Sequence, residues 1–249
     1  MKYNYYKNGY FGAIIKIISE DSAVERIIDK MAFTLAEVLI TLGIIGVVAA
    51  ITIPGLMSKY YEIQTVSRLK ETYSILNQAI RLASEEEGLP EEWGITGRDQ
   101  ASALLVAEKL IPYLKVALDC GTDVTNTNCF TDTYYLLNGT VKSRSDSSNI
   151  KNCISLLNGT SVALEGGSVS NDIYMYALID TNGSAPPNIW GRDIFEFTYR
   201  SEVGLLPSGN PQESSNTYKN FCSNTSHTGY GCAYYVLTFG NMDYLKKKN

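Results

Sequence analysis

The sequence lacks the motifs on which most enzymes depend. It has a single histidine, His227, and it contains no G-x-S-x-G nucleophile motif, no glycine-rich phosphate loop and no paired-carboxylate motif. His227 lies between Cys222 and Cys232, but a zinc site there lacks a fourth ligand and any C-x-x-C pair. The sequence therefore predicts a protein that is not an enzyme.

Charge is also scarce. Charged residues make up 19% of the 249 residues and the net charge is −5, whereas 45% of the residues are hydrophobic. This composition is typical of a globular chain with one or two domains. Residues 1–32 carry five basic and four acidic groups, a balance of +1, which leaves −6 for the remainder. Because phosphate binding needs a basic patch, nucleic acid is not an expected partner.

The sequence does contain one long apolar stretch, residues 32–54, which reads AFTLAEVLITLGIIGVVAAITIP. About 22 residues at about 1.5 Å each make a helix of about 33 Å, which is enough to cross the hydrocarbon core of a bilayer. A buried core helix is the alternative. Arg26 and Lys30 precede the stretch, and basic residues favour the cytoplasmic side, so the bulk of the chain is predicted to lie outside.

Glu37 is the one ionisable group in this stretch. A carboxylate in a membrane helix costs on the order of 2.5 kcal/mol or more at the centre, so it usually has a partner. The surrounding residues resemble the N-terminal motif of the type IV pilin and type II secretion pseudopilin family: a small residue, Ala32, then Phe33-Thr34-Leu35-Ala36-Glu37, an apolar helix and Pro54.

The resemblance implies a role for each residue of the motif. A prepilin peptidase would cut between Ala32 and Phe33, the new amino terminus at Phe33 would be methylated, and Glu37 would pair with that amine on a neighbouring subunit during filament assembly. The family usually has Gly before the cut, and Ala32 departs from that. Residues 1–32 would be a cytoplasmic leader, which is long for the family. A start codon placed too far upstream is the alternative.

The resemblance also implies a function, a location and partners. The chain would be a structural subunit of a type IV pilus-like or type II secretion filament. It would span the bacterial inner membrane once, with its C-terminal domain in the periplasm or in a cell-surface filament. Its partners would be the prepilin peptidase, other pilin or pseudopilin subunits and the inner-membrane assembly platform. One alternative is a minor pilin at a filament tip that acts as an adhesin or ligand-binding module, and another is a membrane-tethered domain that does not polymerise.

The periodicity of the chain predicts an α+β fold. Residues 33–88 are expected to form one long helix, membrane-spanning over about 33–53, because apolar positions from Met57 to Ala83 recur at threes and fours. Pro54 should kink this helix, and Gly88 and Pro90 should end it. An antiparallel sheet in residues 89–249 should pack on its second half.

Within residues 89–249, one shorter helix is expected over 98–114 and strands over the rest. The predicted strands are 134–140, 154–160, 173–179, 194–199 and 233–239. The first two contain the repeated segment LLNGT, in which Asn-Gly between apolar runs is a strong hairpin signal, because both residues tolerate positive φ.

Five cysteines lie in the portion predicted to be outside, where disulfides persist. Spacing favours two local bridges, Cys120 to Cys129 and Cys222 to Cys232, and the last pair resembles the C-terminal disulfide loop of many pilins. Cys153 is then left over, and exchange of partners with it stays open at this point.

An oxygen-rich segment supplies the one candidate metal site. Asp180, Asn182 and Asp193 could together hold calcium, and no other cofactor is expected. Major pseudopilins bind calcium in a C-terminal loop, although their ligands do not align with these residues one by one. The alternative is an ordinary turn, in which Asp and Asn side chains bond the local backbone without any ion.

Overall fold

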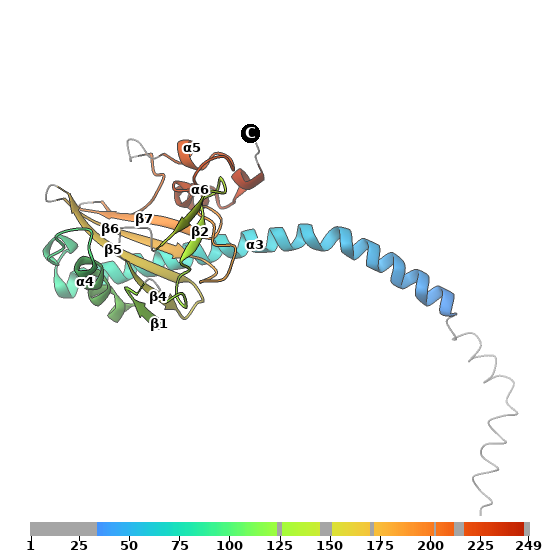
Figure 1. The fold of residues 1–249 in the computed structure, drawn as a ribbon, viewed down its shortest axis with the longest axis horizontal. Coiled ribbons are helices and arrows are strands. Elements are labelled where there is room, and N and C mark those ends of the chain that lie inside the picture. Colours follow the sequence, from blue (N-terminus) through green and yellow to red (C-terminus); the bar gives the residue numbers. More distant parts are fainter. Residues whose placement is uncertain are drawn as a thin grey trace, which may run out of the picture. The chain divides into compact units, whose positions relative to one another are not determined.

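The structure is a computed structural model that describes residues 34–123, 126–144, 151–169, 172–201, 203–211 and 217–246. Its longest element is α3 (Leu35–Glu87), an uninterrupted helix of 53 residues (Figure 1). The chain divides into two compact units, residues 1–57 and 58–249, so α3 contributes its first part to one unit and its second part to the other. The fold class is α+β, as predicted.

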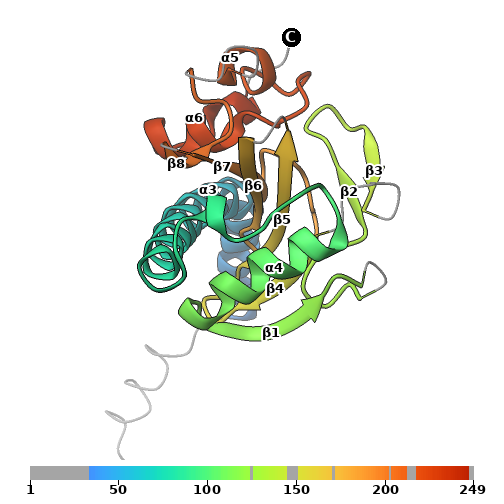
Figure 2. The ribbon, with the colours of Figure 1, turned by 90° about the vertical axis from the view of Figure 1, so that its left-hand side faces the viewer.

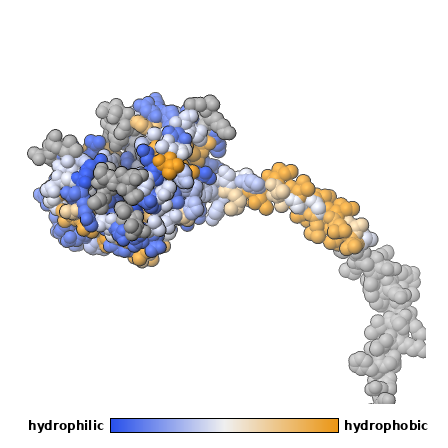
Figure 3. Space-filling view, in the orientation of Figure 1, coloured by the Kyte–Doolittle hydropathy of each residue, from blue (hydrophilic) through white to orange (hydrophobic). Residues whose placement is uncertain are grey.

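The part of α3 in the first unit is largely apolar, as Figure 3 shows for one of its faces. Its large side chains are exposed, for example Leu39 at 61%, Ile45 at 63% and Ile51 at 75%. By length and composition this helix can cross a membrane or serve as a signal sequence. The helix continues through Pro54, and the predicted cleavage residues Ala32 and Phe33 lie outside the described residues.

The part of α3 in the second unit is amphipathic. Its buried apolar side chains recur at helical spacing, and they include Val66, Leu69, Leu76, Ala79 and Ala83. The helix ends at Glu87 and is followed by Gly88 and the short helix η1 (Pro90–Glu92), as the stop signals predicted.

The predicted second helix is shorter than expected. α4 (Gln100–Leu110) is capped by Asp99, whose Oδ1 accepts a hydrogen bond of 2.8 Å from the Ser102 N–H. The 3₁₀ turn η2 (Ile111–Tyr113) follows it. Pro112 has no N–H to continue the α-helical ladder, which accounts for the change of helix type.

The described part of residues 58–249, called the head below, contains two antiparallel sheets. The larger one has six strands in the order β1-β4-β5-β6-β7-β8, and the smaller one is the β2–β3 hairpin. The strands of the larger sheet are β1 (Val116–Gly121), β4 (Asn152–Leu156), β5 (Ser161–Val169), β6 (Asp172–Asp180), β7 (Ile194–Arg200) and β8 (Gly204–Pro207). The hairpin consists of β2 (Thr133–Tyr135) and β3 (Val141–Ser143).

The two faces of the large sheet pack against different partners (Figure 2). Leu164, Ala177 and Phe197 face α3 and α4 and join the main core. Ala163 and Leu178, one position away on their strands, face the other side and pack near the β2–β3 hairpin. Because side chains alternate along a strand, each central strand serves both cores.

The two LLNGT segments form identical hairpin turns. In each, the Gly N–H bonds to the first Leu carbonyl of the pair, Gly139 to Leu136 at 2.9 Å and Gly159 to Leu156 at 3.0 Å. Only the glycines take positive φ, +85° and +80°. The asparagines instead accept hydrogen bonds from the N–H of the following threonines, both at 3.1 Å. The predicted hairpins are confirmed, but the reason given for asparagine is wrong, because it acts through its side chain.

The predicted strand at 233–239 is wrong. These residues belong to helix α6 (Cys232–Phe239), which follows the short helix α5 (Tyr218–Phe221) and precedes the 3₁₀ turn η3 (Asp243–Lys246). The buried residues Cys232, Ala233 and Val236 have helical spacing. Gly240 then closes the helix with φ of +67° and an N–H bonded to Val236 O. The Tyr-, Val- and Phe-rich composition favoured a strand, and tertiary packing overrode it.

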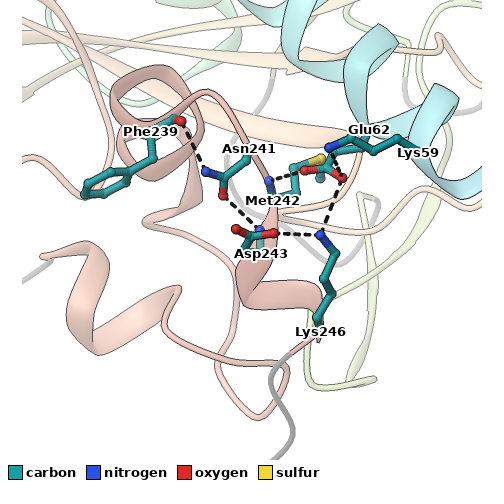
Figure 4. A network of polar contacts seen from close by, with 7 residues as sticks. All are labelled: Lys59, Glu62, Phe239, Asn241, Met242, Asp243 and Lys246. Atoms are coloured by element: carbon teal, nitrogen blue, oxygen red, sulfur yellow. Dashed lines mark hydrogen bonds and ion pairs between the residues drawn. The ribbon is translucent and has the colours of Figure 1, made fainter.

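The C-terminal segment is fastened to α3 by Glu62 (Figure 4). Its Oε1 accepts a hydrogen bond of 3.0 Å from the Met242 N–H, and its Oε2 lies 3.2 Å from Lys59 Nζ and 3.8 Å from Lys246 Nζ. Burial opposes ionisation of Glu62, but the bond from Met242 and the two lysines hold its pKa below the usual value. The carboxylate therefore stays charged and bridges positions 180 residues apart.

Both predicted disulfides are present. Cys120 is bonded to Cys129 across 9 residues and Cys222 to Cys232 across 10. Cys153 is a buried free thiol, and Arg144 Nη1 donates a hydrogen bond of 3.0 Å to its sulfur. Burial raises the pKa of Cys153, so the group is held as a thiol despite the nearby guanidinium.

Candidate functional site

Glu37 closes a hydrogen-bonded box at the start of α3. Its Oε2 accepts from the Thr34 N–H at 2.8 Å and from Thr34 Oγ1 at 2.9 Å, while its own N–H donates to Thr34 Oγ1 at 3.2 Å. This is the reciprocal capping arrangement in which residues three apart satisfy each other's backbone groups. This capping box was not predicted, although its signal, Thr followed three residues later by Glu, is present in the sequence.

The capping box gives Glu37 a partner inside its own chain. A glutamine at this position could still accept the bond from Thr34 N, because amides and carboxylates both fill this role. Capping alone therefore does not require a negative charge at position 37. This separates the local role of Glu37 from the intermolecular role that the pilin resemblance implies.

The other candidate site is the loop that joins β6 to β7. Asp193 is fully buried, and its two carboxylate oxygens accept bonds from the Asn188 N–H at 2.7 Å and the Ile189 N–H at 2.5 Å. Asp180, at the end of β6, is also fully buried, and its Oδ1 accepts from the Asn182 N–H at 3.2 Å. The fold thus brings together all three residues predicted as calcium ligands.

Two amide groups in this loop have oxygen-rich surroundings. Asn182 donates through Nδ2 to the carbonyls of Ala185 and Pro186, at 2.8 and 3.1 Å, while its Oδ1 is buried with no hydrogen-bond partner among the described residues. One atom of the Asn188 amide lies 3.2 Å from Ala185 O and 3.3 Å from Asp180 Oδ2. If that atom is nitrogen it donates to both, and if it is oxygen, three oxygens converge there.

The buried carboxyl groups of Asp180 and Asp193 favour either a bound proton or a nearby positive charge. Burial, and then the neighbouring Asp193 carboxylate, raise the pKa of Asp180 well above its usual value. Burial raises the pKa of Asp193 to about 6, against the hydrogen bonds from Ile189 and Asn188. Within the described residues, no group of three or more His, Cys, Asp or Glu side chains could hold a metal. A cation here would need amide and main-chain oxygens as further ligands.

The comparison with protein families identifies the chain. The family described as "Family of unknown function (DUF6613)" matches residues 55–232, which is more than half of the 249 residues. The chain belongs to this family. Neither a curated protein nor a solved structure matches it.

The DUF6613 match covers one of the two candidate sites. It begins directly after Pro54 and ends at Cys232, so it includes both disulfides and the loop of Asp180 and Asp193. Glu37 lies outside the matched range.

Asn188 was not among the predicted ligands. The orientation of its amide decides whether an oxygen or a nitrogen faces Asp180. Its φ of +52° is uncommon for a residue other than glycine, although asparagine tolerates this conformation better than most.

Proposed function

We propose that this DUF6613 chain is a structural subunit of a type IV pilus-like or type II secretion filament, assembled through the first part of α3. The observation that carries the proposal is that one helix supplies two surfaces of opposite kind. Its first part exposes nearly every apolar side chain, and its second part is built into the core of a globular unit. Contiguous exposed apolar surface of this extent needs lipid or other copies of the helix to cover it.

In this proposal the exposed part of α3 has two successive environments. Before assembly it spans the bacterial inner membrane, with the unit of residues 58–249 in the periplasm. During assembly the same side chains pack against those of neighbouring subunits, so burial from lipid is exchanged for burial in a helix bundle. Glu37 then directs assembly by pairing with the methylated amine of Phe33 on a neighbour. A membrane-tethered domain that does not polymerise remains the competing function.

Processing provides the first test, because it depends only on the junction of Ala32 and Phe33. Co-expression with a prepilin peptidase should yield a chain that begins at Phe33 and is heavier by one methyl group, as measured by intact mass. Ala32→Lys should abolish cleavage, because the small residue before the cut is replaced by a long charged one. Ala32→Gly is the matched control and should be processed at least as well. A native chain that keeps residues 1–32 beside an active peptidase would contradict the proposal.

We also propose that the β6–β7 loop binds calcium. Asp180 and Asp193 would supply the charge, and Asn182 Oδ1 and an Asn188 oxygen turned toward Asp180 would supply neutral ligands, a set that suits a hard cation. The specific support is the buried Asn182 oxygen, unpartnered among the described residues, in a loop with two buried carboxyl groups. Calcium there would fasten the end of β6 to the start of β7.

The calcium proposal predicts a shift in stability. Detergent-solubilised full-length chain should melt at a higher temperature in calcium than in a chelator, since an ion at 100 times its Kd stabilises the folded state by about 2.7 kcal/mol. Asp180→Asn should remove most of this shift, whereas Asp172→Asn, an exposed aspartate at the other end of β6, should retain it. Equal melting temperatures with and without calcium would contradict the calcium proposal and leave the loop as an ordinary turn.

A further inference from the structure

A groove lies on the face of the large sheet opposite α3. It has a volume of about 460 Å³, within the range of about 300–1,000 Å³ that is typical of small-ligand sites. Its floor comes from adjacent strands, because Glu165 pairs across β5 and β6 with Tyr176, and Glu196 of β7 pairs with Leu178. The β2–β3 hairpin supplies one wall. Asp180, Asp193 and Glu37 do not line the groove, although Trp190 of the β6–β7 loop does.

The charges of the groove are organised around Glu165. This side chain is 1% exposed, and its two oxygens lie 2.5 Å from Arg98 and 2.8 Å from Lys151. Arg98 directs Nε and Nη2 to the carboxylate, and among the described residues its Nη1 makes no hydrogen bond. The guanidinium lies 5.2 Å from the centre of the Tyr176 ring, which helps to hold it in place. The Arg98 side chain is nevertheless 40% exposed, so a ligand can reach it.

Among the described residues that line this groove, cations exceed carboxylates by one, in a chain whose net charge is −5. Arg98, Lys142 and Lys151 oppose Glu165 and Glu196. A ligand with one negative charge therefore completes the balance. A dianion such as a phosphate monoester would face the carboxylates of the floor with an excess of negative charge.

The lining also includes three aromatic side chains, Tyr134 of the hairpin, Trp190 and Tyr230. Trp190 and Tyr230 meet edge to face with their ring centres 4.5 Å apart, and Tyr134 lies 6.1 Å from Trp190. Aromatic surfaces with polar ends suit a ligand that has an apolar face and many hydrogen-bonding groups at its rim. A pyranose ring has this character, because its C–H groups lie on one face and its hydroxyl groups around the edge.

We infer that this groove binds an acidic saccharide with a single carboxylate. The carboxylate of the sugar would pair with Arg98 and Lys142, its ring would lie against Tyr134 and Tyr230, and its hydroxyl groups would donate to Glu196. The inference does not depend on the filament function, since the groove is complete within residues 58–249.

The test is isothermal titration of the detergent-solubilised full-length chain with an aldobiuronic acid, one glucuronic acid linked to one xylose. Its methyl ester is the matched probe, because it keeps the shape and removes the charge. The acid should bind, and the ester should bind about tenfold more weakly through loss of the charge-assisted bonds. Arg98→Gln should weaken binding of the acid by about tenfold for the same reason. Lys115→Gln, an exposed lysine outside the groove, should leave binding unchanged.

A second variant and a second probe test the same groove. Arg98→Gln leaves Glu165 with one cation fewer and could unfold the chain, so exposed Lys142→Gln is the second variant and should weaken binding by about threefold. Equal binding of acid and ester, no binding of the acid, or binding that neither variant changes would overturn the inference. A hexaglutamate peptide that binds as tightly as the disaccharide would also overturn it, because the groove would then recognise charge alone.

Discussion

Filaments should disappear when Glu37 is replaced by glutamine, while the chain still enters the membrane and is still cleaved. The Glu37→Gln variant keeps the capping bond from Thr34 but has no charge to offer the amine of Phe33 on a neighbouring subunit. In a bundle of helices that amine would then be buried without a partner. Removing one member of a buried ion pair costs about 3–5 kcal/mol, and this corresponds to a loss of filaments of about 10²- to 10⁴-fold.

Two further variants separate the capping role from the pairing role. Glu37→Ala removes both, and Thr34→Ala removes the cap but keeps the charge. If pairing directs assembly, Thr34→Ala filaments should persist, with the start of α3 destabilised by about 0.5–2 kcal/mol. Thr52→Ala is the matched control, because its hydroxyl bonds to Val48 O within the same helix and takes no part in the cap.

The measurement is to shear filaments from cells and to blot them for this protein beside the membrane fraction. Normal filaments with Glu37→Gln, together with loss in both Glu37→Ala and Thr34→Ala, would show that Glu37 acts only as a helix cap. The chain would then still be a filament subunit, but its assembly would depend on the folded start of α3 and not on a charge at position 37.

The features that could be predicted from the sequence are those fixed over short distances. α3 is one periodic pattern, the two LLNGT turns each lie within five residues, and the disulfides join cysteines 9 and 10 residues apart. In each case the residues that determine the structure are neighbours in the chain. The cap at Glu37 is equally local and could have been predicted from Thr34 and Glu37 alone.

The features that could not be predicted depend on contacts between distant residues. The apolar run of α6 fits a strand as well as a helix by composition, and burial against the sheet together with Gly240 decided the outcome. The groove joins Arg98 to Glu165 across 67 positions, so no local pattern marks it. The role of Asn188 depends on its contact with Asp180, which only the folded loop provides.

The second part of α3 should be indispensable for folding of the head, whereas the first part should not. Leu69 and Leu76 are 0% and 1% exposed within the main core. α3 also bonds directly to the sheet and to the loop after β6: Tyr73 Oη donates to Leu205 O in β8 at 2.9 Å, and Arg68 Nη1 donates to Thr181 O just after β6 at 3.0 Å. A fragment of residues 88–249 loses all of these contacts at once, while a fragment of residues 58–249 keeps them.

The fragment 58–249 should therefore unfold cooperatively on heating, and the fragment 88–249 should show no cooperative transition and no near-ultraviolet circular dichroism. Each buried leucine that is lost costs about 2–5 kcal/mol, and several such losses together exceed the total stability of about 5–15 kcal/mol that is usual for a domain. Both fragments contain the same two disulfides, so the comparison isolates the contribution of α3. A cooperative transition in 88–249 at a similar temperature would show that the sheet and α4 form a core without α3, and that the helix is only attached to the head.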